Sequence, residues 1–427
     1  MKKNPNLILD VHEKPSTGKL IILAFQHVFA MFGATVLVPI LVNSAAGEEV
    51  LSISVALFAA GIGTLMFVLC TKGKSPTFLG GSFAYIAPVA AAYTMGGIGA
   101  AFTGIMVVGI IYIVISYIIK FTGKGWIETL LPPIVVGPMI MIIGLVLASA
   151  AVGQIGLTGE IMEWKGIVVA LVAFLTATLV SLRAKGFLKV IPILSGIIAG
   201  YVLAFILGMV DFEPILAASF FKMPNFQLPF IHYDLSWVGL LTIVPIGIVT
   251  LAEHVGNQKV LSSILDRDIL QDPGLDRTLL GDGVATFFSA FLGNSDTTTY
   301  GENLSVIGFT KIASVAVIVL AAFFSMALGF FDQFTTAIKT IPTPVLGGIS
   351  VLLFGFIASN GIKVLVDNNI DFGKVRNVVI SSVMLVLGLG GAVLSITTKD
   401  LTISVSGMSL AAILGVLLNL FLPQESV

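Results

Sequence analysis

The chain has 427 residues, of which 57% are hydrophobic and only 11% are charged, and its formal net charge is −1. A soluble domain carries about 25% charged residues, so this chain, with a mean hydropathy of +1.06, lacks the polar side chains to cover a surface in water. The composition excludes a soluble globular protein. The charge balance excludes nucleic-acid binding, because no basic face exists to neutralise phosphates. Cys70 is the single cysteine, which excludes an intrachain disulfide and a cysteine-based metal site.

Apolar runs of about 20 residues, long enough for membrane-spanning helices, recur along the chain. We predict fourteen such segments, at 20–42, 52–70, 77–95, 97–119, 128–150, 166–182, 188–209, 236–256, 277–293, 295–310, 312–331, 341–361, 376–396 and 402–422. If the N-terminus is cytoplasmic, 18 of the 22 basic residues fall in cytoplasmic loops and four fall outside, in agreement with the positive-inside rule. The sequence therefore predicts an all-α multi-pass membrane protein with both termini in the cytoplasm.

The widest polar gap before the second half of the chain lies at 211–236 and separates two sets of seven segments. Because seven is odd, the second set must enter the membrane in the opposite sense to the first. This arithmetic is typical of the inverted repeats found in many transporters. The repeat is a topological prediction, since the two halves show no obvious identity between residues.

The third segment of each set is a poor candidate for a continuous helix. Residues 79–88 and 293–301 are rich in glycine, small hydroxyl side chains and β-formers. Irregular backbone at membrane depth is tolerated only inside protein or beside a water-filled cavity, and paired interruptions indicate a transporter's binding site. Amide groups at a helix start can then donate to a ligand. The alternative is that these glycines only allow helices to pack closely.

Two glutamates lie deep in apolar sequence beside these interruptions. Glu253 follows the apolar run 240–251, and Glu302 opens the run that includes 304–309. Carboxylates inside a membrane are rare and expensive, so they are candidates for function. Such a group accepts hydrogen bonds when ionised and donates one when protonated, which suits a site that binds a polar neutral ligand and exchanges H⁺. The alternative for each is a helix cap or a pairing with a neighbouring donor.

The other titratable groups give weaker signals. His254 directly follows Glu253 and points about 100° away on a helix, so it is a candidate either for a proton relay or for packing. His27 is more consistent with capping or packing, and the four histidines have no metal-ligand spacing. We interpret Asp282 and Asp296 as structural, with Asp296 capping the broken tenth segment.

No cofactor is expected, and no Gly-x-x-x-x-Gly-Lys-Ser/Thr motif for binding ATP occurs. An ion gradient is therefore the expected energy source. The acids, which have no cluster of oxygen ligands beside them, favour H⁺ over Na⁺. An integral membrane enzyme is disfavoured, because no nucleophile–base pair or metal cluster is evident.

Several stretches of the chain resemble one family of transporters. They are 26–39 in the first segment, 79–88 in the third, 252–256 in the eighth and 298–303 at the start of the tenth. The signature Gln/Glu/Pro-Asn-x-Gly, four residues, Thr, Arg/Lys/Gly matches 302–311, with Ser305 in the glycine place. Over nearly its whole length the chain resembles the nucleobase–ascorbate transporters (nucleobase–cation symporter 2 type), and within them the bacterial uracil permeases.

The resemblance implies fourteen segments in two inverted repeats of seven, with short strands in segments 3 and 10. Segments 1–4 (20–119) and 8–11 (236–331) would form a core domain. Segments 5–7 (120–235) and 12–14 (332–422) would form a gate domain. Cytoplasmic tails would occupy 1–19 and 423–427.

The resemblance also implies a uracil–proton symporter of the cytoplasmic membrane, working by alternating access among membrane lipids. Glu253 and Glu302 would hold the pyrimidine, the backbone amides of Phe83 and Gly301 would complete the contacts, and Tyr300 and Ala30 would lie nearby. Proton coupling would involve Glu253, Glu302 and His254. Some relatives have a second histidine where this chain has Asn257, which cannot titrate.

Three further possibilities stay open at this stage. A purine or xanthine permease of the same family is one alternative. An anion transporter of the related sulfate-carrier architecture is another, although two acids at the site would repel anions. Homodimers are common among relatives, so a homodimer is a candidate assembly.

Overall fold

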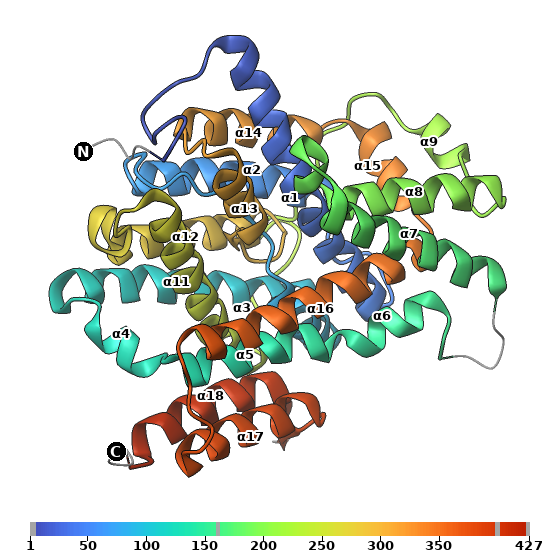
Figure 1. Cartoon of the computed structure of the whole chain (residues 1–427). Coiled ribbons are helices and arrows are strands. Elements are labelled where there is room, and N and C mark those ends of the chain that lie inside the picture. The colour runs from blue at the N-terminus through green and yellow to red at the C-terminus, as the bar shows by residue number, and fades with distance from the viewer. Residues whose placement is uncertain (1–5, 159–162, 398–401, 424–427) are drawn as a thin grey trace.

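The computed structural model describes residues 6–158, 163–397 and 402–423. Most of its helices run in roughly parallel or antiparallel directions, and they form two groups that lie side by side (Figure 1). The predicted C-terminal tail, 423–427, lies almost entirely outside the described residues.

The first group of helices packs around α2, α3 and α12. Its members are α1 (Thr17–Ala46), α2 (Ile53–Cys70), α3 (Ile86–Thr122), α10 (Leu240–Ile243), α11 (Ile246–Leu265), α12 (Leu275–Phe291), α13 (Gly301–Thr310) and α14 (Val315–Leu328). Small residues let these backbones approach closely. A Cβ on Gly109 of α3 would lie 2.7 Å from the carbonyl oxygen of Gly283 on α12, and the reverse distance would be 2.8 Å.

The second group packs around α16 and α5. Its members are α5 (Pro133–Val146), α6 (Ala148–Ile155), α7 (Trp164–Arg183), α8 (Pro192–Ile206), α16 (Thr343–Asp367), α17 (Val375–Leu389) and α18 (Gly407–Phe421). Glycines again set the spacing, since a Cβ on Gly361 of α16 would lie 2.6 Å from the carbonyl oxygen of Gly137 on α5. Helix α11 contacts α12 and α13 in the first group and α5 and α18 in the second, so it lies at the boundary.

Short elements connect these helices. They are α4 (Gly125–Leu130), α9 (Glu213–Ala217), α15 (Asp332–Lys339), the 3₁₀ turns η1 (Phe83–Tyr85) and η2 (Gly186–Val190), and the π-helical turn η3 (Leu270–Gly274). The chain bends by 79° between α14 and α15. Inside α3 the glycine pair Gly96–Gly97 has non-helical backbone angles, and Gly97 has a φ of +67°, so the predicted third and fourth segments are divided at this pair.

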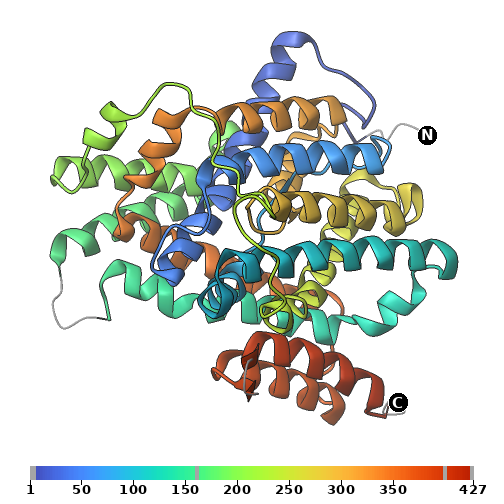
Figure 2. The same ribbon diagram turned by 180° about the vertical axis from the view of Figure 1, so that it is seen from behind.

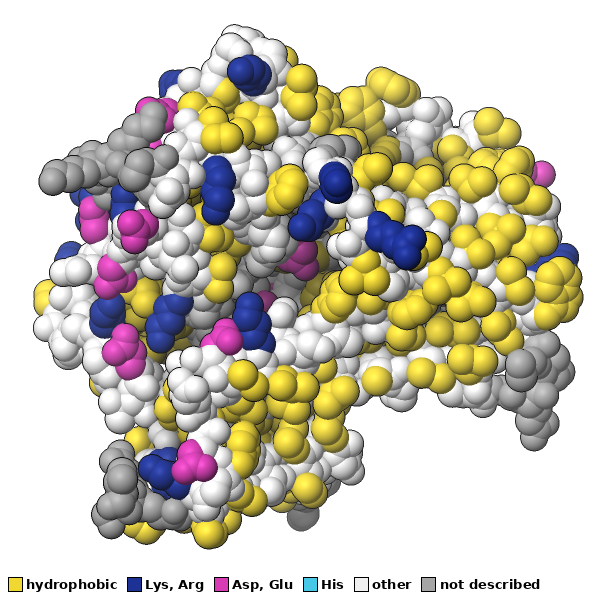
Figure 3. Space-filling model, viewed as in Figure 1, with side chains coloured by type: hydrophobic (Ala, Val, Ile, Leu, Met, Phe, Trp, Pro, Cys, Tyr) yellow, Lys and Arg dark blue, Asp and Glu magenta, His cyan; other side chains and the backbone are white. Residues whose placement is uncertain are grey.

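The structure agrees with a multi-pass membrane protein. Among the described residues, seven helices are long and apolar enough to cross a membrane, or eight if the bent pair α14 and α15 is one span. The outward face of α7 exposes Leu171, Leu175, Leu179 and Leu182, a spacing that places them on one side of the helix. Hydrophobic side chains cover much of the same half of the molecule in the space-filling view (Figure 3). Such a surface is suited to lipid.

Strands occur at both interruptions predicted from the sequence. β1 (Leu79–Gly80) in the third segment pairs antiparallel with β2 (Thr298–Thr299) in the tenth, with Leu79 opposite Thr299. A second hairpin was not predicted. β3 (Val393–Thr397) and β4 (Thr402–Ser406) occupy the end of the predicted thirteenth segment and the start of the fourteenth, so the helices α17 and α18 are shorter than expected. Alternating apolar and hydroxyl side chains favour a strand there.

The predicted polar gap at 211–236 is an extended connector that crosses one end of the first helix group (Figure 2). The amide of Lys222 donates to the carbonyl of Phe330, and that of Gln227 donates to the carbonyl of Leu292. A cavity of about 780 Å³ lies between this connector, α15 and the loop after α1. It is lined by none of the site residues predicted from the sequence.

Candidate functional site

β1 and β2 pair antiparallel at the site, at a place that we call the strand crossing, and each leads into the start of a helix. η1 begins at Phe83, three residues after β1, and α13 begins at Gly301, with Tyr300 between it and β2. The amide of Tyr300 donates to the carbonyl of Phe78 at 2.9 Å, which continues the pairing of the two segments. The first N–H groups of a helix have no partner inside that helix, so two sets of donors are brought to one place.

Glu302 lies in the first turn of α13, where the positive end of the helix dipole stabilises a negative charge. Glu253 lies on α11 and accepts a hydrogen bond from the hydroxyl of Ser82 at 3.1 Å. Both glutamates are partly buried, and the two are close enough for their charges to interact. The structure therefore brings together the two acids that the sequence identified.

Ser82 was not singled out from the sequence, yet it connects several parts of the site. Its hydroxyl donates to Glu253 and accepts from the amide of Ala84 at 3.2 Å, so it also caps η1. Its amide donates to Asp296 at 3.3 Å. The expected role of Asp296 as the cap of the tenth segment is wrong, because Tyr300 is the N-cap of α13 and Asp296 supports the other interruption instead.

Tyr300 is buried and held on both sides. Its hydroxyl donates to the carbonyl of Gly81 at 3.2 Å and accepts from the hydroxyl of Thr35 on α1 at 3.2 Å. A Cβ on Gly80 would clash with the Tyr300 ring, so only glycine allows this approach. Tyr300 thus connects the strand crossing to α1.

The remaining predicted contacts are arranged around the crossing. Phe83 is 9% exposed and its ring packs edge-on against that of Phe354 on α16, with the ring centroids 6.2 Å apart. Ala30 is 9% exposed on α1, a helix that contacts both β1 and α13. Phe83 therefore lies where the first helix group meets the second.

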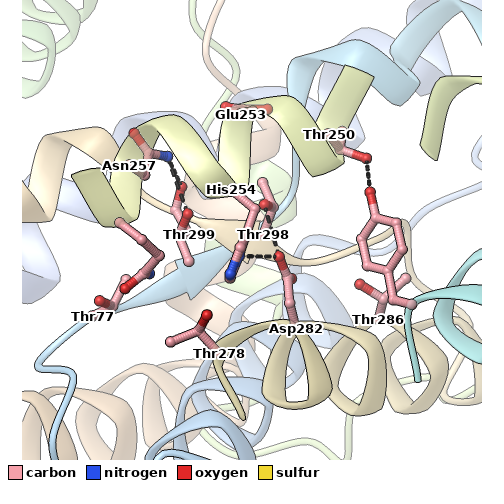
Figure 4. A network of polar contacts seen from close by, with 12 residues as sticks. Thr77, Thr250, Glu253, His254, Asn257, Thr278, Asp282, Thr286, Thr298 and Thr299 are labelled. Carbon is pink, nitrogen blue, oxygen red and sulfur yellow. Dashed lines mark hydrogen bonds and ion pairs between the residues drawn. The ribbon is translucent and has the colours of Figure 1, made fainter. Parts of the chain in front are cut away.

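His254 leaves α11 on a different side from Glu253 and points away from it (Figure 4). Its Nδ1 atom lies 2.6 Å from the Oδ2 atom of Asp282 on α12, and both side chains are fully buried. The hydroxyl of Thr298 in β2 donates to the same carboxylate at 3.3 Å. The pair joins α11, α12 and the second strand. The structural interpretation of Asp282 is thereby supported, although its partner was not predicted.

Two amide side chains complete the support of the second interruption. Asn257 on α11 donates to the backbone carbonyl of Thr299 at 2.7 Å and to its hydroxyl at 3.1 Å (Figure 4). Asn303, next to Glu302, contacts the Nδ1 atom and the carbonyl of His27 on α1, both at 3.1 Å. His27 is buried, which agrees with the predicted packing role.

The comparisons with known proteins agree with one another. A model of a permease family matches residues 18–397. The chain belongs to this permease family. It is 48% identical over 420 residues to the uracil permease of Bacillus caldolyticus, covering 97% of this chain and 95% of that protein. It is 43% identical to the uracil permease of Bacillus subtilis (99% and 96% covered) and 39% identical to that of Escherichia coli K12 (98% and 95%).

Solved structures show the same fold at low sequence identity. The transmembrane domain of the cyanobacterial bicarbonate transporter BicA matches with a TM-score of 0.62 and 14% identity, over 96% of this chain and all of that one. The overall structure of SLC26A9 matches with a TM-score of 0.67 and 14% identity, over 96% of this chain and 67% of that one. The family and its curated relatives are permeases, so the protein is a transporter and not an enzyme. Among the described residues, no group of three His, Cys, Asp or Glu side chains could hold a metal ion.

Beyond the site glutamates, the later turns of α11 and α13 reach the surface of the permease. Past Glu253, α11 exposes Lys259 and Val260, and past Glu302, α13 exposes Ser305 and Phe309. The Nζ atom of Lys189 in η2 lies 5.5 Å from the centre of the Phe309 ring. In the space-filling view, acidic side chains lie recessed in the furrow between the two helix groups, with basic side chains around it (Figure 3).

Proposed function

We propose that this permease is a uracil–proton symporter that imports uracil across the cytoplasmic membrane by alternating access. The observation on which this depends is the meeting of Glu253 and Glu302 at two crossing strands that each lead into a helix start. Relatives named uracil permease at 39–48% identity over nearly the whole chain support the same substrate.

The chemistry of the site matches the edge of uracil. Uracil has two N–H donors and two carbonyl acceptors, and ionised carboxylates only accept hydrogen bonds. Glu253 and Glu302 suit the N–H groups, whereas the amides at Phe83 and Gly301, at the starts of η1 and α13, suit the carbonyls. The rings of Phe83 and Phe354 offer apolar surface to a flat heterocycle.

In this proposal, proton coupling depends on the same two glutamates. Protonation adds an O–H donor to a carboxylate that otherwise only accepts hydrogen bonds, and so changes what the site can bind. Asn257 cannot take part because it does not titrate. His254 acts through its buried pair with Asp282, which orients α11 against the second strand.

The proposed architecture has fourteen segments in two inverted repeats. Besides the long spans, the structure contains the shorter apolar helices α8, α17 and α18. The remaining places in the predicted order are assigned to the two parts of α3 divided at Gly96–Gly97, to α12 as the ninth segment and to β2–α13 as the tenth. The first helix group then corresponds to the core domain (20–119 and 236–331), and the second to the gate domain (120–235 and 332–422).

The bias of basic residues supports cytoplasmic termini. The exposed later turns of α11 and α13, with Lys259 and Phe309, then face the cytoplasm. A homodimer is the assembly that we propose for the membrane, by analogy with relatives.

Uptake of labelled uracil into cells that lack their own permease tests the proposal. We expect uptake that collapses on addition of a protonophore. Persistence of uptake without a proton gradient would refute the coupling, and absence of uptake would refute the substrate.

Competition separates uracil from the nearest alternatives. Unlabelled uracil should compete with labelled uracil, whereas xanthine and other purines should not, because a purine needs a wider pocket. The likeness to SLC26A9 and BicA raises an anion as a second candidate, but two acids at the site repel anions. Anion currents in reconstituted membranes would favour that candidate.

A further inference from the structure

The N-terminal segment, Asn6–Val11, lies against the two helices that hold the site glutamates. Its backbone runs beside the link between α13 and α14, with Leu9 opposite Ile312 in a parallel bridge. The amide of Ile8 donates to the carbonyl of Lys311 at 2.8 Å, and the amides of Ala313 and Val315 donate back to the segment, both at 2.9 Å. The segment thus pairs with the link as an added strand would.

Two side chains of the segment enter an apolar cluster between α11 and α13. Leu7 and Val11 are 4% and 2% exposed, and the cluster is completed by Leu261, Leu265, Ile269, Leu304, Ile307 and Ala313. Leu261 and Leu265 belong to α11, and Leu304 and Ile307 belong to α13. The segment therefore bridges α11 and α13 at the ends of these helices that lie away from the strand crossing.

A largely buried ion pair fixes the segment in place. The guanidinium of Arg267, just after α11, contacts both carboxylate oxygens of Asp10, and Nη1 lies 2.9 Å from Oδ1. Only 16% and 13% of the two side chains are exposed. Burial raises the pKa of Asp10, but the hydrogen bonds and charge of Arg267 outweigh burial, so the pKa lies below its ordinary value. Asp10 is thus ionised in the pair at neutral pH.

Helix α13 has particular need of such a contact. It has ten residues, begins at the strand crossing and ends at Thr310, and the next residue, Lys311, has a φ of +57° that turns the chain toward α14. A helix this short is marginal without tertiary packing. The position of Glu302, at the start of α13, therefore depends on the contacts that hold Thr310 at the end of this helix.

We propose that Asn6–Val11 is a clasp, closed by the Asp10–Arg267 pair, that positions α13 against α11 and so sets the separation of Glu302 and Glu253. Asp10 and Arg267 are positioning residues in this proposal, because neither is among the residues that form the strand crossing. The proposal rests on the proposed function for its substrate, and it extends the site to a part of the chain that the family signature does not include.

The test uses Asp10→Asn, Arg267→Gln and the double variant in the full-length protein. Each single change should raise the KM for uracil in uptake roughly three- to tenfold, and the Kd of the purified protein for uracil by the same factor. The Vmax per transporter should stay unchanged. The double variant should be no worse than either single variant, since both open the same pair. Multiplied effects in the double variant would overturn the proposal, as would an unchanged Kd.

The Lys74–Asp272 pair provides the matched control. Its atoms lie 2.5 Å apart and its side chains are 33% and 51% exposed, so Asp272→Asn and Lys74→Gln remove the same charges elsewhere. The control variants should leave the Kd for uracil unchanged. An equal rise in Kd for the controls would show a general charge effect and refute the clasp.

Hydrogen exchange provides a readout that needs no uracil. Amides near the end of α13 should exchange several-fold faster in Asp10→Asn than in wild type, and not in Asp272→Asn. Unchanged exchange in α13 would overturn the clasp. If the wild-type protein failed to bind uracil, the proposed function would fail, while the exchange data would still decide whether the clasp exists.

Discussion

The interruption around β1 and the interruption around β2 have the same backbone plan but different side chains. Each is a two-residue strand followed closely by a helix start, and the strands pair with each other. After β1 come Ser82 and Phe83, which carry no charge, whereas after β2 comes Glu302. Only the second interruption therefore supplies a carboxylate of its own.

The difference shows how the site divides its chemistry. The first interruption supports an acid that belongs to another helix, because the hydroxyl of Ser82 donates to Glu253 on α11. The second interruption supplies Glu302 and is itself braced by Asp282 and Asn257 through Thr298 and Thr299. A repeated backbone can thus provide two sets of amides, while charge and bracing are specific to each half.

The largest effect on uptake is expected when the charge of the second interruption is removed. Glu302→Gln should lower uracil Vmax/KM by on the order of 100-fold, because it replaces a charge-assisted acceptor with a group that also presents donors. Glu253→Gln should have a similar effect. Uptake assays together with the melting temperature of the purified protein check this, with exposed Glu128→Gln as the control. Normal uptake by Glu302→Gln would contradict the division of chemistry.

The next effect concerns the bracing of the second interruption. Asp282→Leu should lower the free energy of unfolding by about 3–5 kcal/mol, because it leaves His254 buried without its partner. The double variant, Asp282→Leu with His254→Leu, should be more stable than the single variant, since only the Thr298 hydroxyl loses its acceptor and no buried histidine is left without its partner. Thermal unfolding in detergent measures both. A single variant as stable as wild type would show that the pair does not hold α11 and α12 together.

The crossing itself is tested with two neighbouring glycines. Gly80→Ala should cost about 1–3 kcal/mol and reduce uptake, because the new methyl group meets the Tyr300 ring. Gly81→Ala is the matched control, since its Cβ would lie 3.3 Å from a methyl group of Val38, which can shift. Melting temperature and uptake should separate the two variants. Equal behaviour would argue against a tight crossing.

The elements that could be predicted from the sequence are those with a local signal. Both interruptions were evident because glycine and hydroxyl residues break an apolar run, and Glu253 and Glu302 were evident because acids are rare there. The hairpin of β3 and β4 was missed because each strand directly adjoins an apolar helix, α17 or α18, so that strand and helix together have the length of one span.

Pairings across helices could not be predicted in the same way. His254 and Asp282 lie on different helices, and a single sequence does not show which helix faces which. Asp296 was assigned to its own segment because capping is a local rule, whereas the tertiary structure turns it toward Ser82. The role of Ser82 follows only once the third and tenth segments are known to cross.

The smallest effect on uptake is expected when the first interruption loses the hydrogen bond by which it supports Glu253. Ser82→Ala should raise the uracil KM a few-fold, by roughly 1 kcal/mol, because Glu253 loses one donor but, being partly buried, can recover a water. Ser305→Gly is the control, since that hydroxyl is exposed on α13 and donates to the carbonyl of Gly301. A loss as large as that of Glu302→Gln would mean that the first interruption acts on uracil directly, and the contrast between the two interruptions would have to be abandoned.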